Sequence, residues 1–171
     1  EHLKLMLQYA EVASSRGYKV YLNPINITSY DLSDLRLLLD ACNEVKPQCI
    51  SIVDTFGSLN LKMFRNLTDF MDSRLRPDAR LGIHLHENSS LSFGMVQDYL
   101  LECNSNRNII IDASLLGMGR IPGNLPIELI CSYLNGTYNK SYNITPMLKL
   151  IEDIILPIKK LRTWGYAPEF L

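Results

Sequence analysis

The chain has 171 residues, of which 47% are hydrophobic and 20% charged, and its formal net charge is −1. This composition is that of a globular domain large enough for one core, and it excludes a disordered chain. The near-zero net charge indicates neither a nucleic acid nor an anionic membrane as partner, and no apolar run approaches the length of a membrane span.

The first predicted element is a helix over residues 3–13, where apolar residues recur at helical spacing. It stops before Ser14-Ser15-Arg16-Gly17, a helix-stop signal. Residues 18–22 form a short β-rich run that predicts a strand. After a polar loop, a helix is expected over residues 35–45, with Ser33 as its candidate N-cap.

The same rhythm of strand and helix continues along the chain. It predicts three further pairs, at residues 49–53 and 61–71, 80–85 and 91–102, and 108–111 and 125–134. A last amphipathic helix is expected roughly over residues 146–162. The strands recur about every thirty residues, which is the size of one βα unit and predicts a parallel sheet with right-handed crossovers.

Four βα units make half of a (β/α)₈ barrel of about 250 residues, so the predicted fold class is α/β, a partial TIM barrel. A free half barrel would leave two open sheet edges, so either the rest of the barrel is missing or two copies pair. A small, open doubly wound sheet is the alternative. No glycine-rich dinucleotide fingerprint follows any predicted strand, which argues against a Rossmann domain.

The cysteines and the N-terminus bear on location. Cys42, Cys49, Cys103 and Cys131 show neither a C-x-x-C pair nor zinc-type spacing, so we expect free thiols in a reducing cytoplasm. The chain starts at Glu1 without an initiator Met or a signal-peptide pattern, and we expect it to begin inside a longer parent.

Polar residues gather where the predicted strands end, which is where parallel α/β folds carry their chemistry. These residues are Tyr21 and Asn23, then Asp54, Thr55 and Gly57, then the run from His84 to Asn88, then Asp112, Ser114, Gly117, Gly119, Gly123 and Asn124. Among them, Asn23 is a candidate catalytic residue, and Ser114 and Gly119 are candidate substrate-binding residues.

His84 and His86 are two residues apart, and residues at this spacing on a strand face the same way. Two imidazoles on one face can bind one divalent metal ion together. Metal binding also removes the repulsion that two protonated rings would have. An isolated H-x-H pair is more often structural. A strand end beside acidic and amide side chains strengthens the metal hypothesis, with loop-bonded histidines as the alternative.

Two aspartates are weaker candidates. Asp54 shares a predicted strand face with Ile50 and Ile52, and its carboxylate could accept a proton, contact a substrate or support a ligand. An N-cap or turn role before the next helix is equally open. For Asp112 a loop-capping role is at least as strong.

The run from Gly117 to Asn124, Gly-Met-Gly-Arg-Ile-Pro-Gly-Asn, is a glycine-rich loop between a strand and a helix. Its glycines would let the backbone approach a ligand closely, and exposed amides at a helix start suit an oxyanion. The alternative is a tight turn in which Asn124 caps the following helix.

Three of these motifs together resemble a known family. The run from Gly82 to Asn88 resembles its H-x-H-x-N signature, Asp54-Thr-Phe-Gly57 its D-T/S-x-G, and the run from Asp112 to Glu128 its glycine loop ending in G-N-x-x-x-E. They occur in the family's order on consecutive strands. The family is the DRE-TIM metallolyase, or HMG-CoA-lyase-like, superfamily, and the 4-hydroxy-2-oxovalerate aldolase type is the most similar.

The resemblance implies a divalent metal, commonly Mn, Mg or Co, bound by His84 and His86 and, as in lyase members, by Asn124. It places Asp54 near the substrate. The implied function is an aldolase or lyase that cleaves or forms a C–C bond next to a 2-oxo acid through a metal-stabilised enolate. A small-molecule substrate and a homo-oligomer are expected, with no nucleic acid and no membrane.

The chain also departs from the family. The R-D-G-like motif of the first strand, which supplies a metal-ligand Asp and a catalytic Arg, does not occur in it. Residues 1–171 are therefore expected to be the C-terminal half of the barrel, strands five to eight with their helices and a C-terminal helix, inactive in isolation. The loop from Gly117 to Asn124 lacks the lyase branch's Cys, which argues against an HMG-CoA-lyase mechanism.

Two other functions remain open. One is an acetyl-CoA-dependent, Claisen-type acyltransferase like isopropylmalate synthase, and the other is a non-catalytic barrel module.

Overall fold

The computed structural model describes residues 2–103, 106–120 and 122–166. The regular elements in chain order are α1 (His2–Ser15), β1 (Tyr21–Leu22), a 3-10 turn (Ile27–Ser29), α2 (Leu32–Glu44), β2 (Cys49–Val53), α3 (Leu61–Arg74), β3 (Arg80–His84), α4 (Ser92–Glu102), β4 (Ile109–Ile111), a 3-10 turn (Leu115–Gly117), α5 (Ile127–Tyr138), α6 (Thr145–Leu150), a π-helical turn (Ile151–Ile155) and α7 (Leu156–Leu161). Strands and helices alternate as the sequence predicts.

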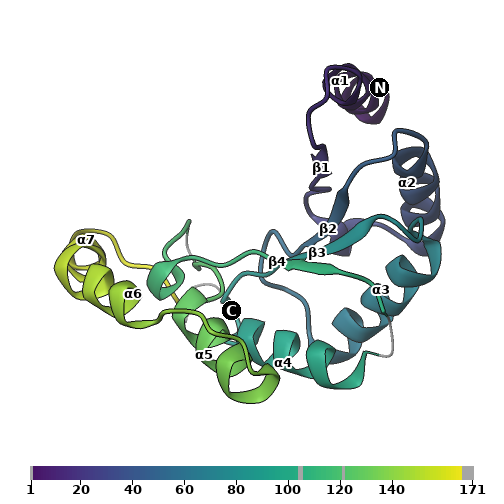
Figure 1. The fold of residues 1–171 in the computed structure, drawn as a ribbon. Coiled ribbons are helices and arrows are strands. Elements are labelled where there is room, and N and C mark those ends of the chain that lie inside the picture. The colour runs from purple at the N-terminus through teal and green to yellow at the C-terminus, as the bar shows by residue number, and fades with distance from the viewer. Residues whose placement is uncertain (1, 104–105, 121, 167–171) are drawn as a thin grey trace.

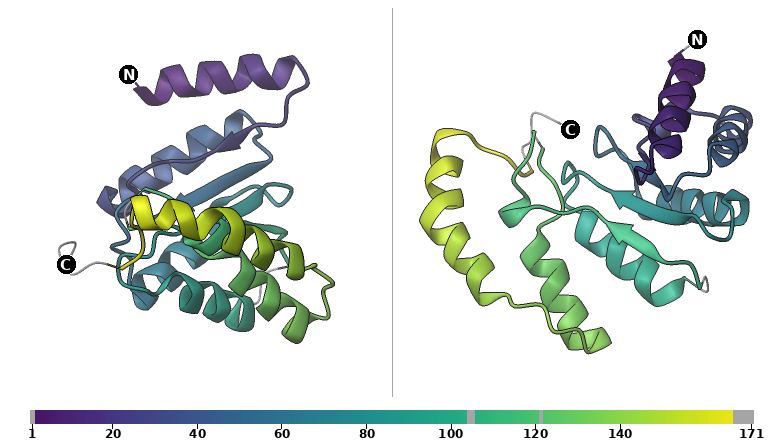
Figure 2. Two further views of the ribbon diagram at one scale, coloured as in Figure 1. Left: turned by 90° about the vertical axis from the view of Figure 1, so that its left-hand side faces the viewer. Right: turned by 45° about the horizontal axis from the view of Figure 1, so that its top comes forward.

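The strands of the described part form one parallel sheet in the order β1-β2-β3-β4, so each strand pairs with its predecessor in the chain. Helices α2, α3, α4 and α5 lie along one side of this curved sheet, and its other side faces away from them (Figures 1 and 2). A doubly wound sheet would reverse its strand order and carry helices on both faces. The described residues instead form a barrel-like arrangement.

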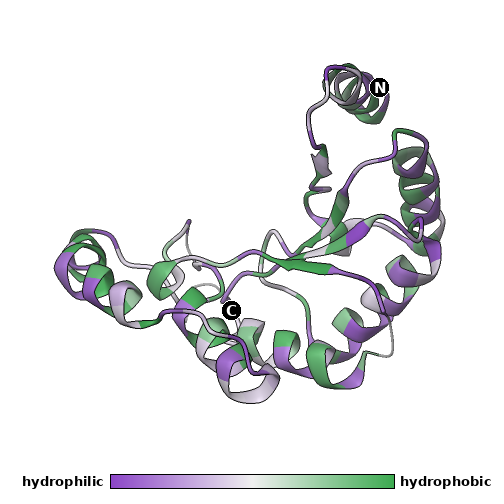
Figure 3. Cartoon of the chain, viewed as in Figure 1, coloured by the Kyte–Doolittle hydropathy of each residue, from purple (hydrophilic) through white to green (hydrophobic). Residues whose placement is uncertain are grey.

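The two faces of the sheet differ in side-chain size, as the alternation along a strand requires. Towards the helices, Ile50, Ile52, Leu81 and Ile83 are almost fully buried in the main hydrophobic core, together with Phe64 of α3. Strand β4 is apolar along its length (Figure 3). This layer of aliphatic residues fixes the strands against the helices and so positions the strand ends.

On the opposite face, Cys49, Ser51 and Gly82 are small residues that lie side by side. A Cβ atom at Gly82 would lie 2.2 Å from Oγ of Ser51 and 3.0 Å from Sγ of Cys49, so only glycine fits beside these side chains. Gly82 lies two residues before His84 in the same strand.

Two helix starts differ from the sequence expectation. Asp31 caps α2, because its carboxylate accepts hydrogen bonds from the backbone N–H of Ser33 and of Asp34, both at 2.8 Å. The expectation that Ser33 is the cap was wrong. Helix α5 begins after Pro126 without a side-chain cap, so Asn124 does not cap it.

The expected C-terminal helix is present but is not a regular α-helix. Helices α6 and α7 are joined by the π-helical turn, and Pro157 is the second residue of α7. In a regular α-helix the Pro157 ring would collide with the carbonyl four residues earlier, and a wider turn avoids this. This helical segment stands apart from the sheet (Figure 1) and packs through Ile151, Ile155 and Trp164 against the 3-10 turn after β4.

No described helix is both long and apolar enough to cross a bilayer.

Candidate metal centre

The two histidines of the H-x-H motif lie together at the carboxyl end of β3. Their ring centres are 5.1 Å apart with an angle of 66° between the planes, and both residues are half-buried. Two imidazoles bound to one ion through N–metal bonds of about 2.1 Å would have their centres roughly 5 Å apart at a near-tetrahedral angle. The spacing of His84 and His86 therefore fits a shared ion.

The hydrogen bonds of both rings assign their tautomers. Nδ1 of His86 lies 2.8 Å from the backbone carbonyl oxygen of Asp54, which can only accept, so this nitrogen carries the proton. Nδ1 of His84 lies 3.0 Å from Oδ2 of Asp112 and donates to that carboxylate. A neutral imidazole has one N–H, so both Nε2 atoms keep their lone pairs for a ligand.

The electrostatic surroundings favour the neutral form of His86. Burial lowers the pKa of His86, and the charges of His84 and Arg120 act in the same direction, whereas the Asp54 carbonyl and carboxylate oppose them. A ring that stays neutral at neutral pH is the form that binds a cation.

Asn124 is joined to this pair by the backbone. It forms an isolated antiparallel bridge with His86, and the N–H of Glu87 donates to the Gly123 carbonyl at 3.0 Å. The amide Nδ2 of Asn124 donates to the Met118 carbonyl at 3.0 Å, while its Oδ1 is buried and has no hydrogen-bond partner in the described part of the chain. A buried acceptor without a partner is costly, and a cation would satisfy it.

The candidate substrate-binding residue Gly119 has a clear packing role. A Cβ atom there would lie 2.2 Å from Nδ2 of Asn124, so glycine is needed for the amide to take its place. The hydroxyl of Ser114, the other candidate, donates to the Met118 carbonyl at 2.6 Å and closes the same loop. A contact of Gly119 or Ser114 with substrate stays a prediction.

Asp54 supports the centre from within the loop after β2. Its residue is 2% exposed, and its carboxylate accepts from the N–H of Ser58 at 2.9 Å and of Leu59 at 3.2 Å. Burial raises the pKa of the carboxyl, and these two amides oppose that rise. The turn role that the sequence left open is therefore present, and the Asp54 carbonyl orients His86. A catalytic role of its carboxylate stays a prediction.

The loop after β2 also locks against the loop after β3. Gly57 has a φ of +62°, and a Cβ atom there would lie 2.4 Å from Cβ of Asn88. The glycine of Asp54-Thr-Phe-Gly57 is thus required by the asparagine that ends the H-x-H-x-N run.

Asn23 lies elsewhere. It is exposed after β1 and lines an apolar groove between α1 and α2 with residues such as Met6 and Leu38. No described contact brings it to the histidine pair, and its catalytic role stays a prediction.

Sequence reasoning gave Asp112 too little weight. Register shows why it meets His84: Ile83 pairs with Ile111, so the residues that follow them, His84 and Asp112, come side by side. Strand alignment, which could have been proposed from the two apolar runs, is the signal that would have found the pair.

Within the residues that the structure describes, no group of three or more His, Cys, Asp or Glu side chains converges as a metal site. The donor set is therefore two imidazole nitrogens and one amide oxygen. Divalent cations take four or more ligands, so this set fits such an ion as part of its coordination shell.

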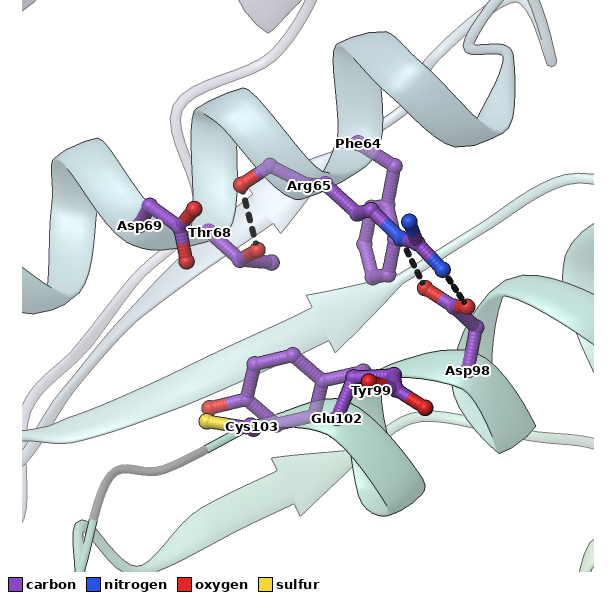
Figure 4. Close-up of a pocket in the computed structure, with 8 residues that line it drawn as sticks. All are labelled: Phe64, Arg65, Thr68, Asp69, Asp98, Tyr99, Glu102 and Cys103. Atoms are coloured by element: carbon purple, nitrogen blue, oxygen red, sulfur yellow. Dashed lines mark hydrogen bonds and ion pairs between the residues drawn. The ribbon is translucent and has the colours of Figure 1, made fainter.

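A small pocket of about 130 Å³ lies away from this centre, between α3 and α4 (Figure 4). The Arg65 guanidinium makes a two-point ion pair with Asp98, with Nε 2.7 Å from Oδ2, and so ties the two helices together. Below it, the Tyr99 ring meets Phe64 edge to face. These contacts hold the helix layer in place.

Comparison with known proteins agrees with these motifs. The HMGL-like family model matches residues 1–154. The chain belongs to the HMGL-like family. The resemblance to HMG-CoA-lyase-like metallolyases is thereby confirmed.

The names of relatives of this HMGL-like chain describe two kinds of enzyme. The 4-hydroxy-2-oxovalerate aldolase 2 of Dechloromonas aromatica is 27% identical over 131 residues, covering 70% of this chain and 36% of the relative. The homocitrate synthase of Sulfolobus acidocaldarius is 26% identical over 170 residues, covering 99% and 35%. The chain thus spans about a third of the length of the curated relatives it matches, and the family includes both aldolases and acyltransferases.

Solved structures share the fold. The N-terminal domain of a Bacteroides vulgatus protein described as an aldolase matches with a TM-score of 0.82 and 22% identity, covering 96% of this chain and 53% of that chain. The hydroxymethylglutaryl-CoA lyase of Pseudomonas aeruginosa matches with a TM-score of 0.76 and 18% identity, covering 91% and 55%. At these identities the likeness shows the fold alone.

Proposed function

We propose that this HMGL-like chain carries the histidine pair of a divalent-metal-dependent aldolase that cleaves or forms a C–C bond next to a 2-oxo acid. The observation that carries the proposal is the donor set itself. Two imidazoles present free Nε2 atoms at a spacing that suits one ion, and the buried amide oxygen of Asn124 lacks a partner beside them.

An ion such as Mn²⁺, Mg²⁺ or Co²⁺ held by His84, His86 and Asn124 would act as a Lewis acid on the substrate carbonyl. The protein's own part is positioning. Asp112 and the Asp54 carbonyl fix the two imidazoles by hydrogen bonds to Nδ1, and such partners commonly change metal affinity 10- to 100-fold. The substrate would lie against the loop that contains Ser114 and Gly119, with Asp54 and Asn23 as catalytic candidates.

The proposal also requires the other half of a barrel. We assign the described strands to positions five to eight, with further metal ligands and the proton-transfer groups on strands outside this chain. The proposed assembly is a cytoplasmic homo-oligomer. The chain alone is then inactive in C–C cleavage, although its histidine pair can be tested for metal binding.

The experiment uses the complete barrel polypeptide that contains this chain. Release of pyruvate from 4-hydroxy-2-oxopentanoate is followed with Mn²⁺ present, beside the metal content of the purified protein. His84→Ala should abolish both metal binding and pyruvate release. The matched control is His2→Ala, which changes the histidine of α1 and should leave both intact. Unchanged pyruvate release from the His84→Ala protein would refute the proposal.

An acyltransferase is the second candidate, because the homocitrate synthase match runs along 99% of the chain. Such an enzyme would release free thiol from acetyl-CoA when a 2-oxo acid is present, and it would not release pyruvate from the hydroxy-oxo acid. A non-catalytic module would hold no metal even in the complete protein, as elemental analysis would show.

A further inference from the structure

A groove lies between the glycine-rich loop and the end of α7. One wall is Met118, Gly119 and Arg120, and the other consists of Ile158 and Leu161 with the segment from Arg162 to Trp164. Its volume is about 540 Å³, within the range of sites for small molecules.

The two walls are fastened to each other. Nε1 of Trp164 donates to the Leu116 carbonyl at 2.8 Å, and the N–H of Gly165 donates to the Pro122 carbonyl at 2.6 Å. A Cβ atom at Gly123 would lie 3.2 Å from Cδ1 of Trp164, so the loop backbone packs closely on the indole. These contacts fix the two walls of the groove relative to each other.

Its surface combines apolar and cationic groups. Ile158 and Leu161 are exposed, Leu161 to 86%. Arg120 and Arg162 also line the groove, and neither is paired with a carboxylate in the described part of the chain. No Asp or Glu is among the lining residues. Guanidinium groups bind carboxylates and phosphates through paired hydrogen bonds, and apolar walls bind hydrocarbon.

The groove shares the glycine-rich loop with the candidate metal centre. The residues of its first wall also hold Asn124, since the Met118 carbonyl accepts from the Asn124 amide and the Arg120 carbonyl accepts from the Gly123 N–H at 2.6 Å.

We propose that this groove binds the end of the substrate remote from the reacting carbonyl, and that this end is a short apolar chain terminating in a carboxylate or phosphate held by Arg120 and Arg162. The inference rests on the proposed function, because it places the reacting end at the histidine pair. It adds a substrate class: a 2-oxo acid that carries a second anionic group at its remote end.

The groove contains its own reporter, because Trp164 is the chain's single tryptophan. Fluorescence of the 171-residue chain, without added metal, is measured during titration with hexanoate, hexyl phosphate and hexanol. We expect saturable changes with the anionic probes and at least 10-fold weaker binding of hexanol. The preferred anion then distinguishes a carboxylate from a phosphate terminus.

The variants Arg120→Gln and Arg162→Gln should each weaken binding of the preferred anion about 10- to 100-fold, the usual value of a charged hydrogen bond. The matched control is Arg36→Gln, on the exposed surface of α2, which should bind as the parent chain does. Unaltered affinity in both groove variants, hexanol binding as tightly as the anions, or no saturable binding would overturn the proposal.

The test separates this proposal from the proposed function. His84→Ala should leave probe binding unchanged while it removes metal binding. If the groove variants bind the anions normally but metal binding is present, only the groove proposal fails. If the anions bind as expected but the complete barrel polypeptide binds no metal, the assignment of the aldolase fails instead.

Discussion

Asp112 and His84 face each other across the edge of β3 and β4, with Oδ2 of Asp112 at 3.0 Å from Nδ1 of His84. This hydrogen bond fixes which ring nitrogen carries the proton and leaves Nε2 for a ligand. The carboxylate thereby supports the candidate metal centre without being one of its proposed ligands.

We predict that Asp112→Ala weakens Mn²⁺ binding about 10- to 100-fold, because the imidazole loses the partner that orients it. Isothermal titration calorimetry on the complete protein measures the affinity. Asp40→Ala, at an exposed position of α2, is the matched control. Equal affinities of the Asp112→Ala and parent proteins would show that the hydrogen bond does not support the metal.

Arg107 should be important for stability. Its Nε lies 2.5 Å from Oδ1 of Asp72, and its two terminal nitrogens donate to backbone carbonyls, those of Arg76 and Ala79 at 2.6 and 2.5 Å and those of Asp72 and Leu75 at 3.0 and 3.2 Å. The side chain is 9% exposed. Arg107→Ala is expected to lower the free energy of unfolding by about 3 kcal/mol, because the carboxylate and several carbonyls lose their donor.

Urea denaturation measures this loss. Arg107→Lys should recover less than half of it, because one ammonium group cannot reach acceptors that a planar guanidinium bridges. As a comparison, Arg65→Ala removes an exposed ion pair and should cost less than about 1 kcal/mol. A lysine variant as stable as the parent would contradict the geometric explanation.

A pH effect on stability follows from Cys42. Burial against the core raises the pKa of this thiol from 9.0 to about 11. The protonated form is therefore favoured in the folded state, and its contribution is complete below pH 9 and is lost as the pH rises through about 11. That contribution is about 3 kcal/mol at most.

Unfolding midpoints in urea at pH 8 and at pH 10.5 test this. Cys42→Ala should show a smaller decrease between the two values than the parent chain. A Cys42→Ala protein with the full decrease would assign the effect to other groups.

The contact between Gly57 and Asn88 gives a prediction with an internal control. Both Gly57 and Gly17 have positive φ values, +62° and +83°, but only Gly57 has a neighbour within contact of an added Cβ atom. Gly17→Ala should therefore cost only the backbone strain, about 1 kcal/mol. Gly57→Ala should cost clearly more in urea denaturation, because the loops after β2 and β3 must separate. Equal costs would show that the loops give way freely.

The sequence predicted the strands and the histidine pair because both depend on local regularity. Strand β4 is a run of Ile and β2 is rich in Ile and Val, and the two-residue spacing alone places His84 and His86 on one side. The bounds of β2 agree with the prediction to the residue. The alternation of strand and helix likewise sufficed for the parallel sheet.

Contacts between distant segments could not be predicted from the sequence. The Arg107 network and the bond between Trp164 and Leu116 join residues that are 28 or more positions apart, and no local pattern marks them. The prediction of where α2 is capped failed for a different reason. Asp31 and Ser33 are both good caps, and only the observed bonds from Asp31 to Ser33 and Asp34 decide between them. The orphaned Oδ1 of Asn124 is equally a product of tertiary packing.

The sequential order of the strands has a consequence for biosynthesis. Since β2 pairs with β1, β3 with β2 and β4 with β3, each strand meets an already emerged neighbour when it leaves the ribosome. His84 and His86 can therefore be in place before the loop around Asn124 has been translated, and the segment around Trp164 closes over that loop last. Cation capture would then be among the final steps of maturation, after most of the sheet has formed.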